Sequence, residues 1–246
     1  MGDKKNETQG TIAPLRNVAL FLELVDRVMR RSSGLPGMAC FTGFSGYGKT
    51  CSAIYAANKY RAFHVQLKSC TTRRSLCTAI LAEIGEVPGA TIDAMVTQIG
   101  RELALSRRPL IVDEADFLIK GGMVELVRDI YESSQATVIL IGEERFPEKL
   151  RRWERVHGRM LDWVQAQPAS LADARHLARL YCRGVEIADD LLAAVHEHAQ
   201  GSARRIVVNL DRVREAAELA SLKKIARAQF QGAFFTGRPP AARSAA

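Results

Sequence analysis

The feature that most constrains this chain is residues 43–50, which read G-F-S-G-Y-G-K-T and match the pattern G-x-x-x-x-G-K-[ST]. An apolar stretch typical of a buried strand, residues 38–41, precedes them, and a stretch typical of a helix, residues 51–58, follows. In this order the glycines let backbone N–H groups turn toward an anion at the positive end of a helix dipole. The context predicts a phosphate-binding loop rather than a glycine-rich turn with an accidental lysine.

The side chains of this loop predict ATP and Mg²⁺ as cofactors. Lys49 is expected to reach the β- and γ-phosphate oxygens, and Thr50 is expected to hold Mg²⁺ through its hydroxyl. The residues predicted to contact the nucleotide are Gly43, Ser45, Gly46, Tyr47, Gly48, Lys49, Thr50 and Cys51.

A second motif follows at a suitable distance, where the apolar residues 110–112 lead into Asp113 and Glu114. Asp113 is expected to hold Mg²⁺ through water, and Glu114 to orient and deprotonate the water that attacks the γ-phosphate.

The letters of residues 113–116, D-E-A-D, also invite comparison with DEAD-box helicases. Those enzymes need a second lobe of similar size, and the remaining chain is too short to supply it.

Strands and helices alternate through the first two thirds of the chain, which predicts an α/β fold with a parallel sheet covered on both faces. The expected strands are residues 38–41, 63–67, 110–112 and 137–141. Residues 168–220 show no strand signal and are expected to form about three helices. The predicted divisions are a disordered N-terminus at 1–13, an ATP-binding α/β domain at 14–166, a helical lid at 167–222, and a basic flexible tail at 223–246.

Positive charge is unevenly distributed along the sequence, whose net charge is +8. No acidic residue occurs between Arg27 and Ala82 or from Ser221 to the end, although both stretches are rich in Lys and Arg. This asymmetry indicates a polyanionic partner, DNA or RNA. The alternative is a generally basic protein whose charges are scattered in space.

Other features argue against a membrane, secreted or metal-cluster protein. No apolar run approaches the ~20 residues of a membrane span, and the polar N-terminus lacks a secretion signal, so a cytoplasmic location is expected. The five cysteines form no C-x-x-C pair. His64 has no second ligand at metal-binding spacing and is expected to be a core or edge histidine.

The combination of motifs resembles the AAA+ ATPases. It comprises the loop at 43–50, Asp113 with Glu114, an arginine-rich segment at 148–159, and a helix opening at residues 201–204. Within that class the sequence is similar to the phage Mu transposition protein B family, the ATP-dependent target-selection proteins of transposons, through residues 13–18 and 34–37. The resemblance covers roughly residues 12–220. It does not include the N-terminal helix-turn-helix domain of the Mu protein, so DNA binding is expected from the ATPase core or the tail.

The resemblance implies two further catalytic residues. Arg155 is similar to the arginine finger that reaches the γ-phosphate of a neighbouring subunit, with Arg151, Arg152 and Arg159 as competitors. Arg204 is similar to the lid arginine that contacts the same nucleotide in cis. The alternative for each is an arginine that faces solvent or forms an ion pair. Glu143 occupies the sensor position after the fourth strand, where an ionised carboxylate can only accept a hydrogen bond, and this puts sensor function in doubt.

The resemblance also implies where DNA binds, because family members line a central pore with the loop after the second strand. The predicted DNA-binding residues are Lys68, Thr71, Thr72, Arg73, Arg74 and, in a second loop, Lys120. Hydroxyl and guanidinium groups suit phosphate oxygens and read no bases. Binding is therefore expected to be largely non-specific and weakened by salt.

The implied function is an ATPase that assembles into a ring or helical filament on duplex DNA and delivers target DNA to a transposase. The expected setting is the cytoplasm of a bacterium or of a phage-infected host. A second hypothesis is a helicase-loader-like or secretion-linked AAA+ ATPase acting on a protein partner. A third is a degenerate scaffold that binds nucleotide and hardly hydrolyses it.

Overall fold

The computed structural model describes residues 15–238. The chain divides into two compact units, one of Asn17–Gln167 and the other of Pro168–Ala246 with Met1–Arg16. The predicted disordered segment 1–13 lies outside the described residues.

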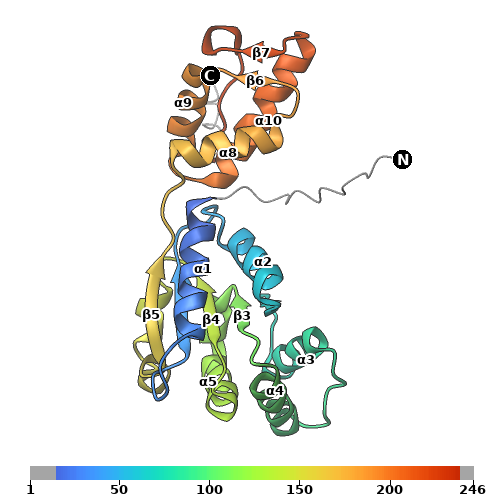
Figure 1. Cartoon of the computed structure of the whole chain (residues 1–246), viewed down its shortest axis with the longest axis vertical. Coiled ribbons are helices and arrows are strands. Elements are labelled where there is room, and N and C mark those ends of the chain that lie inside the picture. Colours follow the sequence, from blue (N-terminus) through green and yellow to red (C-terminus); the bar gives the residue numbers. More distant parts are fainter. Residues whose placement is uncertain (1–14, 239–246) are drawn as a thin grey trace, which may run out of the picture. The chain divides into compact units, whose positions relative to one another are not determined.

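The unit Asn17–Gln167 is built on a five-stranded parallel sheet with the strand order β2-β3-β4-β1-β5 (Figure 1). All four strand pairs in this sheet are parallel, so the carboxyl ends of the strands meet at one edge. The strands are β1 (Met38–Thr42), β2 (Phe63–Gln66), β3 (Leu110–Asp113), β4 (Val138–Gly142) and β5 (Met160–Gln165).

Helices cover both faces of the sheet, and alternate residues of the central strands divide between two cores. Ile111, Ile139 and Ile141 pack with α1 (Arg16–Met29) and α2 (Lys49–Tyr60). Val112 and Leu140 face the other core, under α3 (Arg73–Ile84), α4 (Ile92–Ser106) and α5 (Met123–Ser134). The sheet and its covering layers confirm the predicted fold class.

The strand β5 was not predicted from the sequence. It lies at the edge of the sheet, pairs only with β1, and none of its residues is buried. Its sequence, M-L-D-W-V-Q, therefore lacks the continuous apolar run of a central strand. Three short elements were also missed, namely η1 (Ala115–Gly122), α6 (Phe146–Leu150) and α7 (Glu154–His157).

The second unit contains α8 (Leu171–Tyr181), α9 (Asp189–Ala199) and α10 (Ala203–Leu219) around its own apolar core. It also contains η2 (Arg227–Gln229) and two strands that the sequence did not predict, β6 (Glu186–Ile187) and β7 (Lys224–Ile225), which pair in parallel. Within residues 15–238, no helix combines the length and the apolar character needed to cross a bilayer.

The expectation of a flexible tail from residue 223 is wrong for its described part. Ile225 and Phe230 are buried in the core of the helical unit. The side chain of Asn209 donates to the carbonyl of Phe235 and accepts from its N–H, at 3.0 and 2.6 Å. The aromatic side chains of this segment find apolar partners, and this burial offsets the entropy lost on ordering.

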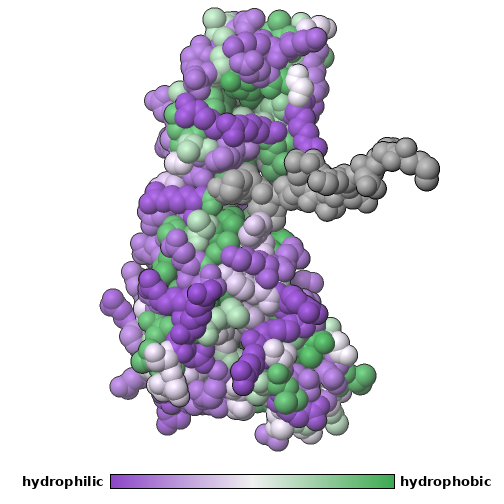
Figure 2. All heavy atoms as spheres, in the orientation of Figure 1, coloured by the Kyte–Doolittle hydropathy of each residue, from purple (hydrophilic) through white to green (hydrophobic). Residues whose placement is uncertain are grey.

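Hydrophilic side chains dominate the face shown in Figure 2, and hydrophobic ones emerge around the loop that joins α3 to α4. Val87 in that loop is 82% exposed. The loop is nevertheless tied to α4, because the side chain of Gln98 accepts from the N–H of Gly89 at 2.9 Å. Isolated exposed apolar residues are ordinary on protein surfaces and mark no site by themselves.

Candidate functional site

The predicted phosphate loop connects β1 to α2 at the carboxyl edge of the sheet. Gly46 and Gly48 have φ values of 85° and 83°, in the left-handed region that glycine adopts without strain. Gly43 is held close to the chain after β5, because a Cβ at this position would lie 2.9 Å from the Cβ of Ala166. Residues with side chains could not take this path at Gly43 without displacing the backbone.

Lys49 begins α2 and folds back over the loop. Its Nζ donates to the carbonyl oxygens of Gly43 at 2.6 Å and Phe44 at 3.0 Å. Burial lowers the pKa of Lys49, while Glu114 and Asp113 oppose that shift. The ammonium group is therefore placed inside the curve of the loop, where phosphate oxygens are expected.

Asp113 ends β3 and is 2% exposed. Its Oδ1 accepts from the N–H of Glu114 at 2.8 Å, whereas its Oδ2 is buried and has no hydrogen-bond partner within the described residues. Buried polar atoms are nearly always satisfied, so an orphaned carboxylate oxygen indicates a missing ligand or water. A hydrated Mg²⁺ fits this requirement.

Glu114 follows in a left-handed backbone conformation, with φ 56° and ψ 39°. Burial raises the pKa of its carboxyl, Asp113 adds to the rise, and Lys49 opposes it. A strained conformation and a carboxyl whose proton affinity is increased are both common where a residue acts on substrate.

The residues present fit Mg²⁺ bound together with a nucleotide. Thr50 lies in the first turn of α2 and is partly exposed, as a metal-binding hydroxyl must be. No group of three or more His, Cys, Asp or Glu side chains between residues 15 and 238 could enclose a metal ion. Mg²⁺ characteristically keeps its waters and takes few protein ligands beside substrate phosphates, which agrees with a site of Thr50 and Asp113.

The end of β4 carries a network that the sequence did not indicate. Asp116 accepts from the N–H of Glu143 and from Nζ of Lys149, both at 2.6 Å. Lys149 Nζ also lies 3.9 Å from the carboxylate of Glu143. The ammonium group of Lys149 therefore brings a hydrogen-bond donor and positive charge to the sensor position. The carboxylate of Glu143 alone could only accept a hydrogen bond there.

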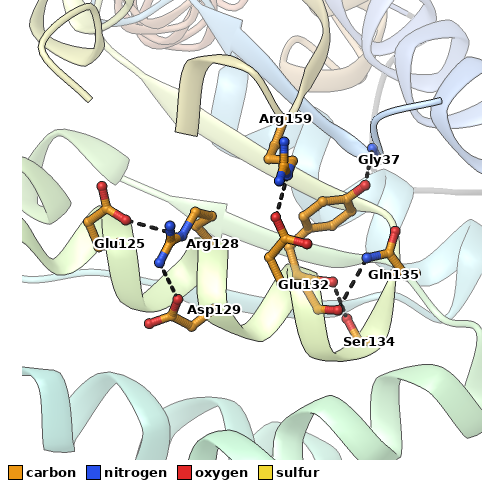
Figure 3. A network of polar contacts seen from close by, with 9 residues as sticks. Gly37, Glu125, Arg128, Asp129, Glu132, Ser134, Gln135 and Arg159 are labelled. Carbon is orange, nitrogen blue, oxygen red and sulfur yellow. Dashed lines mark hydrogen bonds and ion pairs between the residues drawn. The ribbon is translucent and has the colours of Figure 1, made fainter. Parts of the chain in front are cut away.

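The arginine candidates differ in their contacts. Arg159 forms an ion pair with Glu132 of α5, as Figure 3 shows beside the neighbouring ion pairs of Arg128. Arg152 donates to the carbonyl of Ile119 at 3.5 Å. Arg155 is exposed on α7, and its side chain makes no hydrogen bond or ion pair within residues 15–238. Arg204 lies in the first turn of α10, in the helical unit, so its contact with a nucleotide stays a prediction.

The predicted DNA-binding residues after β2 are largely engaged in shaping their own loop. The hydroxyl of Thr71 accepts from the N–H of Lys68, and that of Thr72 caps α3 by accepting from the N–H of Ser75. Arg74 donates to the carbonyl of Ala90 at 2.9 Å.

Arg73 links this loop to the second predicted DNA loop. Its Nη2 donates to the carbonyl of Gly121 at 3.1 Å, directly beside the exposed Lys120. The structure therefore brings the two basic loops together, although one strand and two helices separate them in the sequence. DNA contact by these residues stays a prediction.

Comparisons with known proteins support the assignment of the fold. A family model described as an AAA domain matches residues 32–150. No curated protein gives a significant match to the sequence.

Three solved structures illustrate the likeness. The ORC1 protein of Aeropyrum pernix, in complex with DNA, superposes with a TM-score of 0.62 and 21% identity, over 87% of this chain and 62% of that one. The Drosophila ORC bound to DNA gives a TM-score of 0.60 and 18% identity, over 89% and 60% of the two chains. The RuvB Holliday junction branch migration motor of Thermotoga maritima gives 0.60 and 16%, over 88% and 67%.

At these identities the structural likeness establishes the fold, and the chain spans less than two thirds of the length of the two ORC proteins. The matched family, the parallel sheet and the two nucleotide motifs agree on one assignment: the chain carries an AAA-type P-loop ATPase domain.

Proposed function

We propose that this chain, with its AAA-type ATPase domain, is an ATP-dependent DNA-binding protein. Its affinity for duplex DNA is high when ATP is bound and low when ADP is bound. The observation that carries the proposal is the placement of two functional groups on adjacent strands. Asp113 ends β3 and Glu114 follows it. The basic loop that begins at Lys68 follows β2, which pairs directly with β3. Hydrolysis of the nucleotide beside Asp113 and Glu114 can therefore alter the DNA-binding loop through two strands that pair directly.

The chemistry follows from the side chains at the carboxyl edge of the sheet. Lys49 binds the β- and γ-phosphate oxygens, and Thr50 and Asp113 hold Mg²⁺, which neutralises charge on the phosphates. Glu114 orients a water molecule toward the γ-phosphate and accepts its proton. Arg155 of a neighbouring copy supplies positive charge to the same phosphate, which makes assembly a condition of rapid hydrolysis.

The DNA contacts are made to the phosphate backbone by Lys68, Arg73, Arg74 and Lys120. Arginine and lysine at such contacts bind without reading sequence, and each contact displaces counterions. Two of the solved structures with this fold are bound to DNA, which supports DNA as the partner. We further propose that the assembled protein delivers target DNA to a transposase, on the basis of the sequence resemblance to the transposon target-selection ATPases.

Retention of a labelled, non-specific duplex on filters, at low salt and with ATP or ADP, tests this function. Wild-type protein is expected to retain DNA with ATP and to release it with ADP. The Glu114→Gln variant should retain DNA longer in ATP because hydrolysis is blocked. Absence of any ATP-dependent retention would reject the DNA-binding proposal and favour an ATPase that acts on a protein partner.

A further inference from the structure

Two buried polar atoms face each other beside the nucleotide site, and neither has a hydrogen-bond partner within the described residues. They are Nε2 of His64 and Oδ2 of Asp113, which lie 3.9 Å apart. The side chains are only 16% and 3% exposed. This distance is too long for a direct hydrogen bond, so the arrangement leaves a donor site and an acceptor unsatisfied together.

The register of the sheet explains why the two residues meet. In the parallel pair of β2 and β3, His64 lies opposite Ile111, and Asp113 is two residues further along the same face. Ile111 belongs to the core that includes Ala53 and Ala56 of α2. His64 therefore projects toward the layer that contains α2, the helix whose first turn carries Lys49 and Thr50.

The chemistry of the pair is complementary. An imidazole with its proton on Nε2 donates, and a carboxylate oxygen accepts. A closing movement of about 1 Å, or one bridging water, would satisfy both atoms. Since Oδ1 of Asp113 already accepts from the N–H of Glu114, a bond from His64 would fix the carboxylate at both oxygens and leave lone pairs for a metal-bound water.

We propose that His64 is a positioning residue for Asp113: it hydrogen-bonds Oδ2, directly or through one water, and orients the carboxylate toward Mg²⁺ when nucleotide is bound. Carboxylates that bind metals are characteristically held by such outer hydrogen bonds. The inference rests on the proposed nucleotide site and goes beyond it, because it assigns a role to a residue outside both nucleotide motifs.

The test measures binding of a fluorescent ADP analogue by anisotropy, in Mg²⁺ and separately in EDTA. Wild type is compared with His64→Leu, which removes the donor, and with His64→Gln, whose amide nitrogen can reach the position of Nε2. Gln66→Leu is the matched control, because Gln66 is on the same strand and is exposed. Circular dichroism and thermal melting without nucleotide establish that each variant is folded.

We expect His64→Leu to lose about tenfold in affinity in Mg²⁺ and to bind as wild type does in EDTA. His64→Gln should recover most of the Mg²⁺-dependent affinity, and Gln66→Leu should match wild type in both conditions. If His64→Leu does not fold, the comparison of His64→Gln with His64→Asn, whose amide is too short to reach Oδ2, makes the same distinction.

Two results would overturn the inference. Unchanged affinity of His64→Leu for the ADP analogue in Mg²⁺ would show that His64 does not orient Asp113. An equal loss of affinity in Mg²⁺ and in EDTA would show that His64 has a purely structural role. A wild-type protein that binds no nucleotide in either condition would instead reject the proposed function on which the inference rests.

Discussion

Glu114 shows most clearly how a single residue connects the fold to the proposed chemistry. Its left-handed backbone turns the chain sharply at the end of β3, and its carboxyl remains close enough to Lys49 for the two charges to affect each other's pKa. A carboxylate whose pKa is raised by burial is a stronger base than an exposed one, which suits proton acceptance from water.

Replacing Glu114 by Gln is expected to lower the rate of ATP hydrolysis about 100-fold or more, because the amide cannot accept the proton. Nucleotide affinity should change little, since Lys49 and the loop are untouched. Lys49→Ala serves as the comparison and should lose binding itself. Phosphate release and nucleotide titration measured on both variants test this division of roles, and equal hydrolysis by Glu114→Gln and wild type would contradict it.

The cysteines give a second prediction at this scale, because only a thiolate reacts readily with alkylating reagents. Cys51 and Cys70 are exposed, whereas burial raises the pKa of Cys77 and of Cys182 to about 11. Mass spectrometry after brief alkylation at pH 8 should find Cys51 and Cys70 modified and Cys77 and Cys182 unmodified.

Duplex DNA should slow the alkylation of Cys70, which lies inside the basic loop after β2, by covering that loop. Cys77, a few residues further along α3, is the internal reference for intact folding because its modification requires unfolding. Equal alkylation of Cys70 with and without ATP and DNA would place the DNA contacts elsewhere.

At the scale of elements, the sequence predicted what continuous patterns encode. The three central strands, the phosphate loop and the acidic end of β3 were recognisable, because central parallel strands are apolar on both faces. The edge strand β2 was recognisable from the alternation of its side chains. The edge strand β5 was not recognisable, since it is only partly buried. The pairing of His64 with Asp113 and of Arg73 with Gly121 depends on register and loop path, which no local pattern encodes.

The two adjacent basic loops predict how DNA affinity depends on salt. Replacing Arg73 by Ala should weaken binding to every duplex alike and reduce the slope of log affinity against log salt by about one, as expected for one lost phosphate contact. Arg101→Ala is the control, because Arg101 is exposed on α4 and already paired with Glu102. An unchanged slope for Arg73→Ala would exclude this arginine from the DNA contact.

The glycines of the second loop allow a matched test of stability. Gly121 and Gly122 both have positive φ, at 66° and 68°, but a Cβ at Gly121 meets nothing within 4 Å, whereas one at Gly122 would lie 2.8 Å from the ring of Trp153. Gly121→Ala should cost roughly 1 to 2 kcal/mol of unfolding free energy, and Gly122→Ala ~1 to 3 kcal/mol more. Urea denaturation of the two variants checks this order, and equal losses would contradict the packing against Trp153.

At the scale of the whole molecule, the proposal requires that copies of the chain complete each other's sites. The side chain of Arg155 is exposed and makes no hydrogen bond or ion pair within the described residues. It is therefore available to contact the nucleotide of a neighbouring copy. Glu114→Gln and Arg155→Ala should each be nearly inactive alone. A mixture should regain part of the ATPase rate, because an Arg155→Ala subunit with an intact Glu114 can receive Arg155 from a Glu114→Gln neighbour. A mixture no more active than its components would assign the trans role to another arginine, and Arg151→Ala is then the next variant to mix.

Electron microscopy of the protein with non-specific duplex DNA tests the central claim most directly, because it observes nucleotide dependence, DNA binding and assembly together. With a non-hydrolysable ATP analogue and Mg²⁺ at low salt, we predict rings or filaments of protein along the DNA, and with ADP we predict bare DNA. Bare DNA in both conditions, from protein shown to bind the analogue, would contradict the account.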